Sequence, residues 1–200
     1  MTRKASQRGL SLIEVMIAVA LAGLLLAIGL PSFSTGIQNR QIRTAAGAIQ
    51  NGLQMARTEA LRRNRNVVFT LRAQNGYTVS CADNIGPGGT PICPEPLQTR
   101  EGSEGSANAQ TAAVQWSVAS NAAAASPVFT GNLKFTPLGR VTDDSLPAGN
   151  QAIYQVSNPT GGSCAAAGGP MRCLTVVVTK FGQIRSCDPA VADATDPRRC

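Results

Sequence analysis

The sequence predicts an α+β protein in which a long N-terminal helix packs on an antiparallel β-sheet domain with disulfide-stapled loops. After a short basic leader, apolar residues recur at helical spacing to about residue 64. Beyond that point apolar and polar residues alternate, which is typical of half-buried strands. Six cysteines fall in the part of the chain rich in glycine and proline. We therefore divide the chain into a leader at 1–9, a transmembrane helix at 10–30, an amphipathic helix half at 31–64 and a β-rich globular domain at 65–200.

The run from Leu10 to Leu30 is apolar except for Glu14. At about 1.5 Å per residue, a helix of this length spans roughly the 30 Å of a bilayer's hydrocarbon core. The residues before it carry positive charges at Arg3, Lys4 and Arg8, which would also suit a plain N-terminal anchor. A carboxylate inside such a helix is unfavourable by about a few kcal/mol. We therefore expect Glu14 to pair with a positive charge of a neighbouring chain or with a newly made amino terminus.

The amphipathic half begins at Pro31, which lacks a backbone donor and is expected to kink the helix. One apolar stripe follows, with spacings of three and four residues, and predicts the helix face that packs on the domain. The stripe consists of Ile42, Ala46, Ile49, Leu53, Ala56 and Ala60. Arg62 and Arg63 suit the negative end of the helix dipole, so we expect the helix to end near them.

The β-rich domain opens with a predicted hairpin. Val67–Leu71 and Tyr77–Ser80 flank Asn75-Gly76, a pair that tolerates positive φ in a tight turn. Residues 81–112 are rich in Gly, Pro, Ser and Asn and predict a long loop. Further strands are expected at Val114–Val118, Asn132–Phe135, Ala152–Val156, Leu174–Thr179 and Gln183–Cys187, and Ala122–Ala125 is ambiguous. Short strands after a helix favour an antiparallel sheet wrapped on the helix stripe.

The six cysteines indicate disulfides rather than a metal site. The chain has no histidine and no Cys-x-x-Cys pair, so a zinc site is disfavoured. Disulfides form in oxidising compartments, which an exported domain reaches. Fifteen pairings are possible. The simplest set joins neighbours, Cys81–Cys93, Cys164–Cys173 and Cys187–Cys200, and a Cys173–Cys187 link is the main alternative.

The composition argues against an enzyme. Histidine, the commonest general base and metal ligand, is absent, and no glycine-rich phosphate loop or close carboxylate pair stands out. We therefore predict no catalytic residue, no metal and no cofactor. The formal charge is +7, and the leader holds three of the 18 basic residues. The remaining 15 basic against 11 acidic residues make the rest of the chain only mildly basic.

A small residue, Gly9, stands before the apolar run, and no small-residue cleavage site follows the run. Together with the basic leader and Glu14, this arrangement resembles the class III signal of type IV pilins and type II secretion pseudopilins. The resemblance implies that a prepilin peptidase cuts after Gly9 and leaves the apolar helix in the mature protein. It also implies methylation of the new amino terminus at Leu10.

Two further regions narrow the resemblance. The stretch Gln54–Ala60 looks like the "ARSEA" sequence that closes the helix in the GspH/FimT/FimU group of minor pilins. Met171–Leu174, Gly182–Pro189 and Asp196–Cys200 look like the C-terminal part of the same group. Residues 81–165 carry no such resemblance.

The resemblance implies a single-pass inner-membrane protein whose C-terminal domain is periplasmic and which enters a filament. As a minor pilin it would prime assembly of a type IV pilus or cap its tip, beside other minor pilins and the major pilin. The alternative is a minor pseudopilin of the type II secretion system, beside its major pseudopilin. In either filament, Glu14 of an incoming subunit would pair with the methylated terminus of Leu10 on its neighbour and set the axial register.

A DNA-binding role in natural transformation is a further alternative, because the FimT branch carries a G-R-x-R motif implicated in DNA binding. Here Gly182, Ile184 and Arg185 hold matching positions, but Gln183 replaces the first arginine. The cations that would join Arg185 in a basic patch are Arg172, Lys180, Arg198 and Arg199. Such a patch would bind phosphates without sequence specificity. Asp188, Asp193 and Asp196 lie among these cations and weaken the patch, and a solvated surface is the competing interpretation.

Overall fold

A computed structural model describes residues 11–86, 88–119, 122–123 and 129–200, without the side chains of residues 28–32, 122 and 123. The predicted leader 1–9 and the predicted processing residues Gly9 and Leu10 lie outside these residues. The chain divides into two compact units, Met1–Ile37 and Gln38–Cys200. Helix α1, Leu12–Arg63, extends through both, so its second half shares a unit with the strands.

Helix α1 continues through Pro31. The kink expected there stays a prediction, because that side chain lies outside the described residues. The C-terminal end falls where the basic residues predict it. Asn64 takes a left-handed conformation with φ 52°, and the amides of Asn64 and Arg65 donate to the carbonyls of Leu61 and Ala60 at 3.3 and 3.2 Å. These two bonds form a Schellman motif, which satisfies carbonyls left free at the end of the helix.

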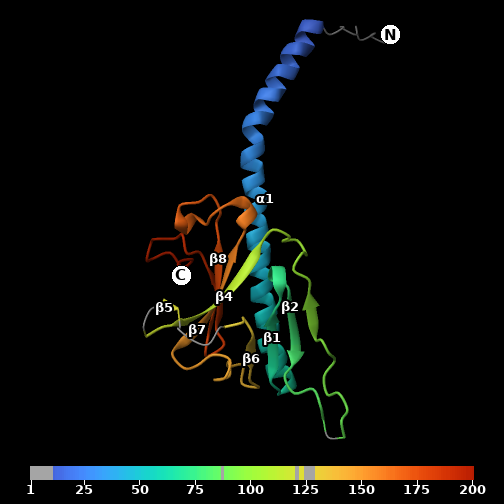
Figure 1. Cartoon of the computed structure of the whole chain (residues 1–200), viewed down its shortest axis with the longest axis vertical. Helices are drawn as coiled ribbons and strands as arrows, with labels where there is room; N and C mark the ends of the chain where they lie inside the picture. The colour runs from blue at the N-terminus through green and yellow to red at the C-terminus, as the bar shows by residue number, and fades with distance from the viewer. Residues whose placement is uncertain (1–10, 87, 120–121, 124–128) are drawn as a thin grey trace, which may run out of the picture. The chain divides into compact units, whose positions relative to one another are not determined.

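The stripe predicted from the spacing of apolar residues is confirmed as the buried face of α1. Its six members are at most 1% exposed, and Ala45, which the spacing does not include, joins them. They pack in one hydrophobic core with residues from both sheets. In the view of Figure 1, the second half of α1 runs between the strands of the two sheets.

The described strands form two antiparallel sheets, where the sequence predicts one. The first has the order β3-β2-β1-β6 and consists of β1 (Val67–Leu71), β2 (Tyr77–Cys81), β3 (Gln98–Arg100) and β6 (Leu133–Phe135). The second has the order β5-β4-β7-β8-β9 and consists of β4 (Gln110–Ser117), β5 (Ala122–Ala123), β7 (Asn150–Ser157), β8 (Leu174–Thr179) and β9 (Ile184–Cys187). The chain enters the second sheet after β3, returns to the first sheet for β6, where three residues pair with β1, and continues in the second sheet from β7. The α+β class is confirmed.

The predicted hairpin of β1 and β2 forms, but its turn and the predicted loop that follows differ from the prediction. The β1–β2 connection is not a two-residue turn at Asn75-Gly76, since Leu71 pairs with Tyr77 and the short 3-10 helix η1 (Ala73–Asn75) lies between them. Positive φ occurs at Gln74 and Asn75, whereas Gly76 is extended at φ −68°. The predicted loop 81–112 also contains β3 and the start of β4, because pairing with β2 and β7 orders residues that have little strand propensity.

Asn75 is a buried link between the sheets rather than an exposed turn residue. It is 1% exposed. Its side-chain Nδ2 donates to the carbonyl of Ala109 at 2.5 Å, and its Oδ1 accepts from Thr111 Oγ1 at 2.6 Å. A second link is the hydroxyl of Tyr154 on β7, which donates to the carbonyl of Gly131 just before β6 at 2.8 Å. Burial raises the pKa of Tyr154 well above its usual value, so this hydroxyl stays a donor.

The disulfides join neighbours in the sequence: Cys81–Cys93, Cys164–Cys173 and Cys187–Cys200. No Cys173–Cys187 link forms, and none of the six cysteines is free. The second bond closes the segment that holds the 3-10 helix η3 (Ala165–Ala167), and the 3-10 helix η2 (Pro159–Gly161) lies just before this segment. Each closed loop of this length stabilises the fold by ~3 kcal/mol through restriction of the unfolded chain.

Gly52 is placed where α1 comes close to the first sheet. A Cβ atom at this position would lie 2.7 Å from the ring of Tyr77 and 2.9 Å from that of Phe69. These two rings stack with their centroids 5.4 Å apart, and Phe69 also meets Tyr154 edge to face. A glycine inside a helix is unfavourable by about 1 kcal/mol relative to alanine. Its presence here is explained by the space that the rings require.

We predict that Gly52→Ala lowers the free energy of unfolding by ~1–2 kcal/mol, because the added methyl forces the two rings apart and this outweighs the gain in helix propensity. Gly47→Ala is the matched control on the same helix, since a Cβ there meets nothing within 4 Å. It should raise the free energy of unfolding by ~0.5–1 kcal/mol. Urea unfolding of the full chain in detergent, followed by the fluorescence of the single tryptophan, measures both. A stabilised Gly52→Ala variant would contradict the packing argument.

Candidate functional site

The first half of α1 exposes apolar side chains around its whole circumference. Exposure between Leu12 and Leu26 ranges from 44% at Val15 to 80% at Leu12. Glu14 lies in the first turn, where its amide donates to the carbonyl of Ser11 at 3.1 Å, and its side chain is exposed among these apolar residues. A helix that is apolar on all sides requires an apolar environment, which lipid or other apolar helices provide.

In the part of the chain that the structure describes, no helix combines the length and the apolar character that crossing a bilayer requires. The segment predicted at 10–30 includes Leu10 and the side chains of residues 28–30, which lie outside that part.

Of the five C-terminal cations predicted to bind DNA, Lys180 lies apart from the other four, which surround the C-terminal segment. Lys180 lies in the turn between β8 and β9, and Arg172 lies before the opposite end of β8, a strand about 20 Å long. Arg185 lies on β9 opposite Val177 in the middle of β8. Gly182 adopts φ 78° in the turn, where its amide donates to the carbonyl of Thr179 at 2.9 Å.

Carboxylates neutralise three of the five cations. Arg172 pairs with Asp188 at 2.8 Å and Arg198 with Asp196 at 2.6 Å, and Lys180 pairs with Asp143. The hydrogen bonds from the Arg198 side chain lower the pKa of Asp196 to about 2, so this pair stays ionised at neutral pH.

Arg185 and Arg199 are exposed and have no ion pair among the described residues. They are neighbours, because Arg185 Nη1 lies 3.4 Å from the carbonyl of Arg199. Gln183 is also exposed, two positions from Arg185. Its amide donates to Thr179 Oγ1 at 3.2 Å.

The structure adds one cation that the sequence does not point to. Arg43 on α1 lines a hollow of about 270 Å³ together with Arg172, Arg198 and the buried Asp188. In the sequence, Arg43 is only a polar residue next to the apolar stripe. Its approach to the C-terminal segment depends on contacts between residues more than 120 positions apart, such as the bond of 2.7 Å from the Arg172 amide to Asn39 Oδ1.

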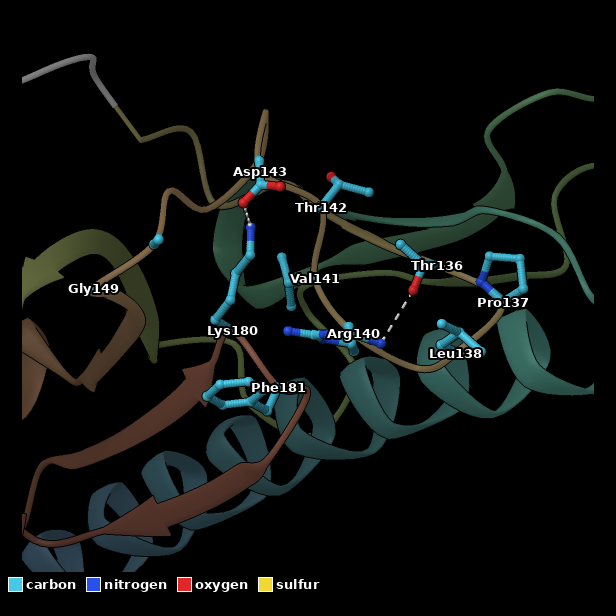
Figure 2. Close-up of a pocket in the computed structure, with 11 residues that line it drawn as sticks. Thr136, Pro137, Leu138, Arg140, Val141, Thr142, Asp143, Gly149, Lys180 and Phe181 are labelled. Carbon is cyan, nitrogen blue, oxygen red and sulfur yellow. Dashed lines mark hydrogen bonds and ion pairs between the residues drawn. The ribbon is translucent and has the colours of Figure 1, made fainter.

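A larger hollow of about 730 Å³ lies between the loop 136–149 and the β8–β9 turn (Figure 2). Leu138 and Phe181 border it with highly exposed side chains, and the guanidinium of Arg140 stacks 5.1 Å from the centre of the Phe181 ring. On the far rim, Lys180 pairs with Asp143 and donates to the carbonyl of Leu146 at 2.7 Å. The sequence analysis did not identify this surface, because its apolar residues are single exposed positions in turns without a periodic pattern.

Two family models match the chain. The prokaryotic N-terminal methylation motif matches residues 4–30. The model for the type II transport protein GspH matches residues 45–182, more than two thirds of the chain. The chain belongs to the GspH family.

Among solved structures, this GspH-family chain is similar to the type IV minor pilin FimU of Pseudomonas aeruginosa strain PAO1 in two crystal forms. The first match has 16% identity and a TM-score of 0.44, and covers 72% of this chain and 86% of FimU. The second has 15% identity and the same TM-score, and covers 76% of this chain and 97% of FimU. None of the curated proteins compared with the chain matches it.

The GspH match includes most of the buried stripe of α1 and ends at Gly182, before β9. The chain is therefore a type IV pilin-like minor pilin or pseudopilin, a structural subunit that assembles with other pilins in a pilus or pseudopilus. Arg185, Arg198 and Arg199 lie outside the matched residues, so the family match does not bear on their predicted contact with DNA. Among the described residues, no group of His, Cys, Asp or Glu is placed to hold a metal ion.

We predict that the full chain in detergent gives no mobility shift with duplex DNA at low salt, because Lys180, Arg172 and Arg198 are held by carboxylates. Gln183→Arg should create weak, salt-sensitive binding, since residues 183 and 185 point to the same side of an extended strand and would present two free cations together. The double variant Gln183→Arg, Arg185→Ala is the control and should not bind. A clear shift with the unaltered chain that Arg185→Ala removes would show instead that DNA binding is intact.

Proposed function

We propose that this GspH-family subunit is a minor pilin that primes assembly of a type IV pilus or caps its tip. The observation that carries the proposal is Glu14, the one carboxylate of an exposed apolar helix half that lies inside the matched methylation motif. Apolar contacts alone let parallel helices slide along one another. A single charge pair between neighbours fixes one position, since a slip of one helical turn separates the charges by about 5.4 Å.

Glu14 would pair with the methylated amino terminus of Leu10 on the adjacent subunit. An ionised carboxylate in an apolar environment is strongly unfavourable without a partner. The same carboxylate becomes favourable when a cation and hydrogen bonds satisfy it, so the pair selects the subunit that arrives in register. Gly9, as the residue before the cut, would let the prepilin peptidase create that terminus.

The proposed location is the inner membrane, with one helix over residues 10–30 and a periplasmic domain. The apolar circumference of the first half of α1 suits lipid before assembly and other apolar helices after it. The three disulfides suit an oxidising compartment on the far side of that membrane. The amphipathic half at 31–64 and the domain at 65–200 would then be presented together to the other subunits.

The match to the type II transport protein GspH supports the alternative of a minor pseudopilin in type II secretion. Deletion of the gene separates the two machines. Loss of surface pili in electron micrographs with unchanged protein secretion supports the pilus, whereas loss of secreted enzymes with normal pili supports the secretion system. A strain in which both are normal would remove the proposed function.

We predict that Glu14→Ala abolishes recovery of the subunit in sheared filaments, because an incoming subunit can no longer be held in register. Folding and membrane insertion should be unchanged, since the side chain is exposed and the helix only becomes more apolar. Immunoblots of the sheared and membrane fractions measure the two effects. Glu14→Asp is the matched control and should restore part of the incorporation. Normal recovery of Glu14→Ala would remove the pairing argument.

We predict that the mature protein begins at Leu10 with a methylated amine and that Gly9→Val accumulates as an uncut precursor in the membrane. A branched side chain before the scissile bond should not fit a peptidase site that accepts glycine. Intact-mass and terminal-peptide mass spectrometry of the purified chain checks both points. A mature terminus at Met1, at Thr2 or beyond Leu30 would contradict the class III signal.

A further inference from the structure

Five side chains from three segments form one surface at the end of the domain where α1 terminates, and we call it the turn surface. They are Arg57 and Leu61 on α1, Leu138 and Arg140 on either side of Gly139, and Phe181 before Gly182. The two glycines show that these segments touch. A Cβ at Gly139 would lie 3.0 Å from Arg57 Nε and 3.4 Å from Leu61 Cδ1, and a Cβ at Gly182 would lie 3.2 Å from Arg57 Nε and against the carbonyl of Gly139.

The turn surface exposes a group of large apolar side chains. Leu138 is 77% exposed, Phe181 66% and Leu61 49%. Leu138 and Phe181 border the hollow of about 730 Å³, and Figure 2 shows both side chains on the same side of it, above α1. Single exposed apolar residues are ordinary on a protein surface, but several around one hollow are typical of an interaction site.

The turn surface also carries cations without carboxylates. Arg57 Nε is buried and has no hydrogen-bond partner. Its guanidinium forms no ion pair with any residue that the structure describes, and Arg140 contacts the Phe181 ring instead of an acid. By contrast, Arg62 and Arg63 on the same helix pair with Glu59 at 2.7 and 2.6 Å. Asp143, which lines the hollow, forms its ion pair with Lys180. The Nε lies beneath the Gly139 and Gly182 turns, so an acidic ligand would be attracted by the charge of this guanidinium rather than bonded to Nε.

We propose that the turn surface binds an acidic and apolar segment of a neighbouring filament subunit. A carboxylate of that segment would face Arg57 and Arg140, and its apolar side chains would cover Leu61, Leu138 and Phe181. The partner's identity as a filament subunit rests on the proposed function, whereas its chemistry rests on the charges and exposed side chains of this surface. Complementary charge would also set the orientation of the partner.

The test places a photo-reactive benzoylphenylalanine at Leu138 of the full chain, expressed in its own cells. Ile85 is the matched control, because it is also 77% exposed but belongs to the loop 82–97, which contributes no side chain to the turn surface. After irradiation, the adduct is purified through the chain and sequenced by mass spectrometry. We expect the Leu138 adduct to contain one protein with a prepilin-type N-terminus, linked through a peptide that carries Asp or Glu. Ile85 should give no such adduct.

Charge reversal then tests the chemistry. Arg140→Glu in the Leu138 crosslinking background should reduce the yield by ~10-fold, because it sets a like charge against the partner's carboxylate, whereas Arg140→Lys should retain it. Arg140 is exposed, so the reversal should not unfold the domain, and thermal unfolding of the purified variant checks this. Replacement of the partner's crosslinked acid by Lys should restore the yield with Arg140→Glu.

Several results would overturn the inference: no adduct at Leu138, an adduct only with DNA or with a protein outside the filament, or a yield that Arg140→Glu leaves unchanged. The proposed function fails separately. If the chain is recovered in sheared filaments but Leu138 gives no adduct, the docking inference is wrong and the filament role stands. If Leu138 gives the pilin-type adduct but the chain is absent from filaments, the turn surface binds an acidic and apolar segment as inferred, and the filament role is wrong.

Discussion

Seven residues on one face of the second half of α1 are buried against strands of both sheets, and this packing decides where the other parts of the domain lie. Each fully buried Ile or Leu of the stripe contributes about 1.5–3 kcal/mol relative to exposure. The four alanines among the seven let the sheets come close to the helix backbone. Gly52 has no Cβ and so leaves the space that the rings of Tyr77 and Phe69 occupy. With the helix fixed in this position, Arg57 meets the turns at Gly139 and Gly182, and Arg43 meets the C-terminal segment.

The sequence predicts those parts of the structure that depend on local pattern. The apolar stripe, the helix end near Arg63 and the strand at Leu174–Thr179 all follow from spacing and propensity, and the structure has them where predicted. Parts that depend on distant contacts were missed. The sequence predicts Asn75 to be an exposed turn residue. In the structure its side-chain amide is buried and forms hydrogen bonds to Ala109 and Thr111, which lie more than 30 positions away. The strand β3 forms because it pairs with β2, and its sequence has no periodic pattern that predicts a strand.

At the candidate sites, the sequence likewise fails to predict which charged residues are paired. Arginines with similar sequence surroundings have different roles in the fold. Arg62 and Arg63 are held by Glu59, Arg172 and Arg198 by aspartates, Arg185 is free of carboxylates among the described residues, and Arg57 is partly buried without a partner. A count of basic residues therefore overestimates the charge available to DNA at the C-terminus. It also misses the turn surface, where Arg57 and Arg140 have no carboxylate among the described residues and the apolar neighbours favour a polypeptide.

The hydrogen-bonded links between the sheets have a consequence for how the domain loses its structure. The described strands of one sheet form no ladder with those of the other, so the sheets are joined by the shared core and by hydrogen bonds such as those of the Asn75 amide and the Tyr154 hydroxyl. Each link satisfies a buried polar group of one sheet with an atom of the other. If one sheet came apart alone, it would leave an unpaired donor or acceptor inside the other, which is unfavourable. We therefore expect the domain to unfold as one cooperative unit, with a partly open subunit that keeps a single intact sheet only sparsely populated.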